Sequence, residues 1–154
     1  MQTEECNMTS DAVHNPNLRA TLLDPLGVPR EALSAHLWIV AGVPAGIIHK
    51  LAELVETDVG VICKLAGISR STLSRKLKNK APLSVSQGAR VYGVVQALEA
   101  VLALHRNNTA KALSWLHRPA WGLCGVAPAL VLNTPMGVQA VVNLVGRIQH
   151  GVCQ

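Results

Sequence analysis

Helical signals follow one another closely from residue 31 onward, and no stretch of the chain alternates between apolar and polar positions long enough to form a strand. The pattern therefore predicts an all-α fold. Helix starts are marked by Pro, Ser, Asp, Asn and Thr, which cap a helix or fit its first turn. We expect helices over residues 31–40, 44–56, 58–66, 69–79, 84–105, 109–117, 128–132 and 134–151.

The last of these helices has the clearest boundaries. Thr134 and Pro135 form a cap and first-turn pair, and Gly151 ends the helix. Between them, hydrophobic residues recur at intervals of three and four, which predicts one buried face. These residues are Val138, Val141, Val142, Val145 and Ile148.

The same signals divide the chain into three parts. Residues 1–29 are polar and interrupted by proline and glycine, so we expect a flexible N-terminal arm with at most one short turn of helix. Residues 30–106 are predicted to form one helical region that ends in the long helix 84–105. Residues 107–154 are predicted to form a second, smaller helical domain.

Composition supports a folded protein with an aliphatic core. Of the 154 residues, 49% are hydrophobic, yet there are only three Trp, one Tyr and no Phe. Two long uncharged stretches, 32–49 and 119–146, are interrupted by proline and polar residues, which argues against membrane spans. The N-terminus lacks the features of a secretory signal, so we expect a cytoplasmic protein. The four cysteines have no disulfide or zinc-site spacing, and we expect neither metal nor cofactor.

Positive charge is concentrated in the middle of the chain. The net charge is +5, seven of the fourteen Lys and Arg residues lie between Lys64 and Arg90, and no acid occurs between Asp58 and Glu99. Within this region VGVICKLAGISRSTLSRKLKN has the layout of a helix-turn-helix. Gly67 permits the turn, and Ile68, Leu73 and Leu77 are expected to hold the second helix against the first.

The polar face of the second helix is a candidate DNA-binding surface, because hydroxyls and cations suit phosphates and guanine edges in a major groove. The alternative is that these cations only solvate an amphipathic helix. The acid-free surroundings, the turn glycine and the capping serine favour DNA contact. The candidate residues are Ser69, Arg70, Ser71, Thr72, Ser74, Arg75, Lys76 and Lys78.

The C-terminal third contains an unusual series of motifs: Trp-Leu, Pro, Leu-x-Gly-x-x-Pro, Thr-x-x-Gly and Gly-Arg-Ile-x-x-Gly. The chain from Val43 to Gln154 resembles the Xre/MbcA/ParS antitoxins, and its helix-turn-helix resembles that of Xre-type repressors. The matching positions are Trp115, Leu116, Pro119, Leu123, Gly125, Pro128, Gly137, Leu144, Arg147, Ile148 and Gly151. Cys124, Val126, Ala127 and Gly88 depart from the family pattern.

The resemblance implies an Xre-like helix-turn-helix region followed by a small helical toxin-binding domain. Such a domain neutralises a RES-domain toxin, which degrades NAD, by covering the toxin's active site with the C-terminal helix and tail. The weakly positive surface after Glu99 suits an acidic partner. The residues expected to contact the toxin are Trp121, Leu123, Arg147, Ile148, His150, Gly151, Val152, Cys153 and Gln154, with Arg147 as the charged plug.

We expect different environments for the two tryptophans of this domain. Trp115 is expected in the core, where a large ring anchors helix packing. Trp121 lies in a Pro- and Gly-rich loop, where either packing or contact with a partner is open.

The sequence argues against an enzyme, because no nucleophile and base occur at recognisable spacing and no glycine-rich phosphate loop is present. An antitoxin that reads operator DNA would repress its own operon, and a palindromic operator would require a homodimer. The alternative is a stand-alone helix-turn-helix regulator whose C-terminal domain dimerises or senses a ligand.

Overall fold

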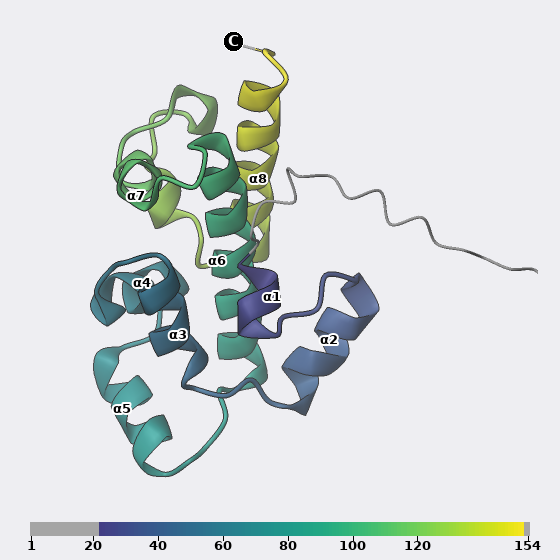
Figure 1. The fold of residues 1–154 in the computed structure, drawn as a ribbon, viewed down its shortest axis with the longest axis vertical. Helices are drawn as coiled ribbons and strands as arrows, with labels where there is room; N and C mark the ends of the chain where they lie inside the picture. Colours follow the sequence, from purple (N-terminus) through teal and green to yellow (C-terminus); the bar gives the residue numbers. More distant parts are fainter. Residues whose placement is uncertain (1–21, 153–154) are drawn as a thin grey trace, which may run out of the picture.

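The computed structural model describes residues 22–152, and every regular element within them is a helix (Figure 1). The all-α prediction is confirmed; an isolated bridge pairs Ala120 with Val126. The α-helices are α1 (Leu23–Leu26), α2 (Ala32–Ala41), α3 (Ile47–Leu54), α4 (Val59–Ala66), α5 (Arg70–Lys78), α6 (Val85–Leu104), α7 (Thr109–Leu116) and α8 (Pro135–Gln149). Two 3-10 turns, η1 (Trp121–Leu123) and η2 (Pro128–Leu130), lie between α7 and α8.

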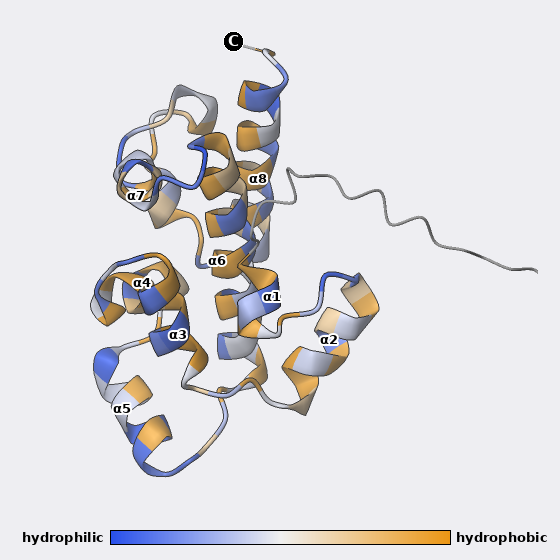
Figure 2. Ribbon diagram, viewed as in Figure 1, coloured by the Kyte–Doolittle hydropathy of each residue, from blue (hydrophilic) through white to orange (hydrophobic). Residues whose placement is uncertain are grey.

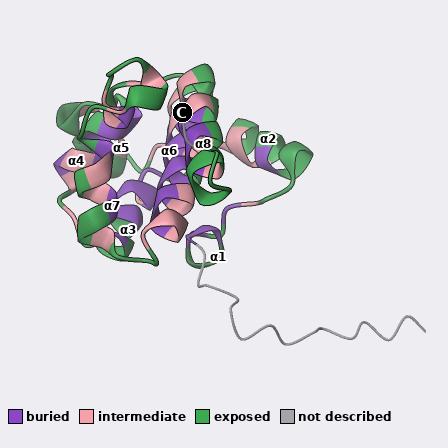
Figure 3. Cartoon of the chain, turned by 90° about the horizontal axis from the view of Figure 1, so that it is seen from above, coloured by how far each residue is buried: buried purple, intermediate pink, exposed green. Residues whose placement is uncertain are grey.

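Helix α6 is the centre of the molecule, and α2, α4, α7 and α8 all pack against it. The core around it is aliphatic, as the composition predicts: the largest fully buried side chains are all Leu, Ile or Val. Figure 3 shows these buried positions running along the inner sides of the helices around α6. Because α6 is continuous from Val85 to Leu104, it connects the helix-turn-helix half of the chain to the C-terminal half.

Capping side chains account for where several helices begin. Ser69, Asn108 and Thr134 each accept a hydrogen bond from a backbone N–H in the first turn of α5, α7 and α8. Ser84 and Gln87 form a reciprocal capping box at the start of α6. Each cap satisfies a donor that the helix leaves unpaired, which is worth about 1 kcal/mol. The predicted starts at Ser69, Asn108 and Thr134 are therefore confirmed.

The start of α3 differs from the prediction. Pro44 is not its first helical residue, because Ile47 and Ile48 donate three residues back, to the carbonyls of Pro44 and Ala45, and form turns. The regular helix starts at Ile47. The backbone just before this segment is bonded to the residues that precede α6, since the Val43 carbonyl accepts a hydrogen bond from Leu83 N at 2.8 Å.

The expectation of a flexible arm is wrong for residues 22–29. Leu22, Leu23 and Leu26 are buried in the core around α1, and Val28 is buried beside them. The hydroxyl of Tyr92 also donates to the Pro29 carbonyl at 3.3 Å. Burial of these aliphatic side chains stabilises a segment that has only one turn of helix. Residues 1–21 of the predicted arm lie outside the described residues.

Candidate functional site

Helices α4 and α5 form the predicted helix-turn-helix. Gly67 ends α4 in the left-handed conformation, with a φ of +64°, which favours glycine. Ile68 and Leu73 are buried and join the start of α5 to the core. The guanidinium of Arg90 on α6 donates to the Gly67 carbonyl at 2.8 Å, so α6 holds the turn directly.

The expected role of Leu77 is wrong. Its side chain is 39% exposed, so it does not hold α5 against α4. It lies instead beside Lys76, Lys80 and Pro82, on a shallow surface pocket next to the α2–α3 connection. Only the first turns of α5 are therefore buried, because the helix leaves the core after Leu73.

Four of the candidate DNA-binding side chains have partners within the protein. The hydroxyls of Ser69 and Ser71 share a hydrogen bond of 3.1 Å. The Ser69 hydroxyl accepts from Thr72 N at 3.1 Å and donates to the Thr72 hydroxyl at 2.8 Å. Arg70 forms an ion pair with Asp58, whose carboxylate also caps α4 at Gly60 N. The Ser69 cap was predicted from the sequence, whereas the contacts of Arg70, Ser71 and Thr72 were not.

The candidates on the outer face of α5 form a surface open to solvent. Ser71, Ser74, Arg75 and Lys78 are exposed, and Lys76 is half-buried. None of these cations forms an ion pair with an acid among residues 22–152. We call the exposed residues Ser71, Ser74, Arg75 and Lys78 the α5 surface. It offers two hydroxyls and two cations along one helix, which is chemistry suited to phosphates and base edges.

The loop before α8 presents a large aromatic side chain to solvent. Trp121 on η1 is 93% exposed, whereas Trp115 on α7 packs against the core as expected and lies 6.3 Å from the His105 ring. The sequence left open whether Trp121 packs within the protein or contacts a partner, and its exposure shows that packing was the wrong alternative. Leu123, next along η1, is half-buried and packs against the core.

Motif residues of the C-terminal third have identifiable structural roles. Gly137 has no room for a side chain, since an added Cβ would overlap the Val131 carbonyl. Leu144 is buried and covers Gly122, so α8 and η1 lie side by side. Cys124 has φ of +55°, a conformation that favours the glycine usual at this position in the resembled family.

Helix α8 ends with several exposed side chains. Gly151 adopts a φ of +69° and Val152 N donates to the Arg147 carbonyl at 2.9 Å, which closes the helix as predicted. Arg147, Ile148, His150 and Val152 are exposed. Together with Trp121 we call them the α8 surface. Cys153 and Gln154, also expected to contact the toxin, lie outside the described residues.

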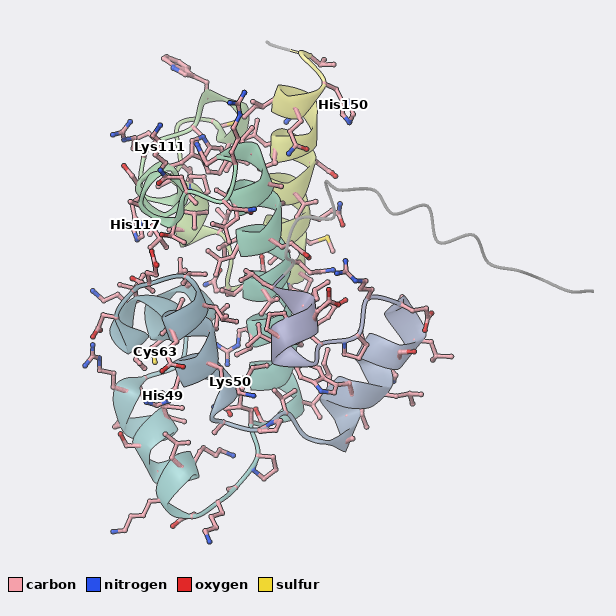
Figure 4. The ribbon with its side chains drawn as sticks, viewed as in Figure 1. His49, Lys50, Cys63, Lys111, His117 and His150 are labelled. Atoms are coloured by element: carbon pink, nitrogen blue, oxygen red, sulfur yellow. The ribbon has the colours of Figure 1, made fainter. Side chains whose placement is uncertain are left out.

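The α5 surface and the α8 surface lie at opposite ends of the molecule (Figure 1). Figure 4 shows His150 at the end of α8, far from His49 and Lys50 on α3 at the helix-turn-helix end. A ligand on one surface would leave the other accessible.

The thiol of Cys63 is buried. Burial raises the pKa of the Cys63 thiol, which keeps it in the unreactive protonated form. No group of His, Cys, Asp or Glu within residues 22–152 is placed to hold a metal ion. Over the same residues, no helix is long and apolar enough to cross a membrane.

Two family profiles match consecutive parts of the chain. Residues 39–96 match the antitoxin Xre-like helix-turn-helix domain, and residues 97–151 match the antitoxin Xre/MbcA/ParS C-terminal toxin-binding domain. The junction between the two matches falls inside α6. The division predicted after residue 106 remains a prediction.

Relatives include two proteins named Antitoxin Xre. The one from Photorhabdus laumondii subsp. laumondii is 32% identical over 111 residues, covering 72% of this chain and 75% of the relative. The one from Yersinia enterocolitica is 28% identical over 105 residues, covering 68% and 69%. A protein from Sphingobium sp. named Prs ADP-ribosylating antitoxin is 25% identical over 141 residues, covering 86% and 82%.

Proposed function

Because this chain belongs to the Xre antitoxin family, a family of binding proteins without catalytic activity, we propose that it neutralises a RES-domain toxin and represses its own operon. In this proposal the α8 surface covers the active site in which the toxin degrades NAD. The protein acts in the cytoplasm as a homodimer within a toxin–antitoxin complex.

The exposed end of α8 is the observation that carries the toxin proposal. Arg147, Ile148, His150 and Val152 are solvent-accessible on a helix whose opposite face is buried against α6. Trp121 lies on the 3-10 turn packed beside that helix, and exposed aromatic and arginine side chains are frequent anchors of protein interfaces. Leu123, Gly151, Cys153 and Gln154 complete the proposed contact set.

Rescue of cells from the toxin tests this proposal. A chain that ends at Gly146 lacks the proposed contacts from Arg147 onward but retains the buried residues Val141, Leu144 and Val145. We expect it to lose rescue of cells that express the cognate RES-domain toxin. Lys50→Ala, on exposed α3 surface outside both candidate surfaces, is expected to rescue fully. Rescue by the truncated chain would contradict the proposal.

The α5 surface supports the operator-binding half of the proposal. It combines exposed hydroxyls with cations that have no acidic partner among residues 22–152, on the second helix of a helix-turn-helix, where major-groove readers carry their base contacts. Ser69, Thr72 and Arg70 then contribute mainly by holding that helix, because their side chains bond within the protein. Lys76 would contribute charge toward phosphates.

The alternative is a stand-alone regulator whose C-terminal domain dimerises or senses a ligand. A pull-down of the co-encoded toxin separates the two functions. Retention of the toxin on the immobilised chain is expected. Operator binding without any toxin retention would favour the regulator.

A further inference from the structure

Within residues 22–152, six α-helices end in the same kind of turn, in which one residue has the left-handed conformation. The N–H of this residue and the N–H of the next one both bond back to carbonyls in the last turn of the helix. After α1, α4 and α8 the left-handed residue is a glycine: Gly27, Gly67 and Gly151. After α3, α5 and α6 it is a charged residue, namely Glu56, Lys80 and Arg106, with φ of +53°, +50° and +54°.

A side chain at the left-handed position destabilises such a turn relative to glycine. In this conformation the Cβ of an L-residue lies too close to the following carbonyl oxygen, and glycine has no Cβ. The glycine turns of α1, α4 and α8 make the same hydrogen bonds, so the fold does not require a charged residue there. Unfavourable backbone conformations of this kind are frequent where a side chain binds a ligand or makes a compensating contact.

Glu56 has its compensating contact within the chain. Its Oε2 atom accepts a hydrogen bond from the Thr109 hydroxyl at 2.9 Å, which joins the end of α3 to the start of α7. Lys80 has no such contact, since its side chain is exposed and forms neither a hydrogen bond nor an ion pair with residues 22–152. The Lys80 ammonium is therefore accessible to a ligand.

The surroundings of Lys80 indicate that this ligand is an anion. Lys80 shares a shallow surface pocket with Lys76 and Leu77, and Lys78 of the α5 surface is two positions away. None of the three lysines has an acidic partner in the described part of the chain. The end of α5 and the turn after it, at the bottom of the view, are mostly hydrophilic (Figure 2). Like charges this close in the chain repel one another, and a bound anion would relieve the repulsion.

The helix dipole explains part of this cluster but not Lys80. Cations in the last turn of a helix are stabilised by the dipole, and Lys76 and Lys78 have that position in α5. Lys80 lies after the last turn, at the one position where glycine is more favourable. Its charge therefore points to a role in binding.

We propose that Lys80 binds a phosphate group of operator DNA beside the major groove that receives α5. The inference rests on the proposed operator binding, to which it adds a contact outside α5. A lysine ammonium binds phosphates as a point charge, and phosphate contacts position a protein on the duplex without reading its sequence. The α5 surface then contacts base edges, while Lys80 and Lys76 contact the flanking DNA backbone.

Titration of DNA at several salt concentrations tests this contact. The probes are a duplex of the DNA directly upstream of the reading frame for this chain and a random-sequence duplex of equal length. Lys80→Gly is expected to raise the Kd for both duplexes by about three- to tenfold. It is also expected to reduce the slope of log K against log salt by about 0.9 for each bound copy, because one phosphate contact per copy is lost. Lys80→Arg keeps the charge and is expected to keep the wild-type slope.

The stability of the same variant separates binding from folding. Lys80→Gly removes the left-handed Cβ and is expected to raise the Tm by about 2–4 °C. Weaker DNA binding by a more stable protein cannot result from damage to the fold. Arg106→Gly is the matched control, because Arg106 is an exposed cation in the same kind of turn at the other end of α6, next to α7 (Figure 1). We expect a similar rise in Tm and an unchanged salt slope.

The results that would overturn the proposal are distinct from those that would refute operator binding. If the wild type binds the upstream duplex and Lys80→Gly binds it with the same Kd and salt slope, Lys80 makes no phosphate contact. An equal loss of slope in Arg106→Gly would show a general effect of net charge and would also overturn it. A wild type that binds the upstream duplex no more tightly than the random duplex would refute the proposed operator binding and this contact together.

Discussion

Two glycines in α8 have opposite environments, so that a methyl group added at one position would clash and at the other would not. A Cβ at Gly137 would overlap the Val131 carbonyl, whereas a Cβ at Gly146 meets no atom within 4 Å. Gly137 therefore lets the first turn of α8 lie directly on the preceding segment. Gly146 has no such contact and is a helix-interior glycine, which destabilises a helix relative to alanine.

We expect Gly137→Ala to lower the free energy of unfolding by about 1–3 kcal/mol, because backbone must move to accept the new methyl group. Gly146→Ala is the control in the same helix, and it is expected to raise stability by about 0.5–1 kcal/mol. Chemical denaturation of both variants measures the two changes. Equal effects of the same sign would mean that the contact with Val131 does not constrain α8.

Arg70 and Arg75 both lie on α5, but they differ in whether they form an ion pair. Arg70 is paired with Asp58, whereas Arg75 is exposed and has no acidic partner among the described residues. We expect Arg75→Ala to weaken operator binding by about tenfold or more, since an arginine contact to a base edge is worth about 1–3 kcal/mol. Gel-shift titration measures the loss, with Lys111→Ala on α7 as the control. Unchanged affinity would remove Arg75 from the DNA interface.

At the scale of whole elements, helix starts and the position of the helix-turn-helix could be predicted, because caps and turns depend on neighbouring residues. Ser69 and Asn108 are such caps, and Gly67 is such a turn residue. The burial of α1 and the exposure of Leu77 could not be predicted, because they depend on packing against elements distant in the sequence. The Arg70–Asp58 pair spans twelve positions and was missed for the same reason.

Prediction of the candidate surfaces from the sequence was limited in the same way. Sequence patterns selected α5 and the end of α8, but they did not separate side chains that hold the helix from those that remain open to a ligand. Arg70 and Arg75 were both predicted to bind DNA, yet only Arg70 forms an ion pair with Asp58. That difference appears only when hydrogen-bond partners are known.

Helix α6 contains a carboxyl group whose environment opposes ionisation. Burial raises the pKa of Glu99, with Arg30 opposing the shift. A carboxyl with a raised pKa stabilises the fold below its unfolded value, near 4.5, and this contribution is lost as the pH rises through the folded value. Ionised Glu99 therefore lowers stability at neutral pH.

We expect Glu99→Gln to raise the Tm at pH 7 and to leave it nearly unchanged near pH 4, where the wild-type carboxyl is largely protonated. The Tm of the wild type and of Glu99→Gln is measured against pH. A Tm difference between the two chains that does not vary with pH would show that Glu99 is not destabilised by burial.

At the scale of the molecule, α6 keeps the two candidate surfaces apart while connecting their supports. Arg90 of α6 holds the turn at Gly67, and Gly93 of the same helix lets Val138 of α8 pack closely, with an added Cβ only 2.7 Å from its Cγ2. In the proposed function, toxin binding and operator binding therefore use different side chains on one scaffold. Distant sites without shared partners usually respond independently to mutation.

This separation predicts that each activity can be removed alone. We expect Arg75→Ala to lose operator affinity and still rescue cells from the toxin. The chain that ends at Gly146 is expected to fail in rescue and still bind the operator, because α4 and α5 remain intact. Gel shifts and rescue assays on both variants, and on their combination, measure the independence. Loss of both activities from either single change, with folding unaltered, would show that the two surfaces act as one site.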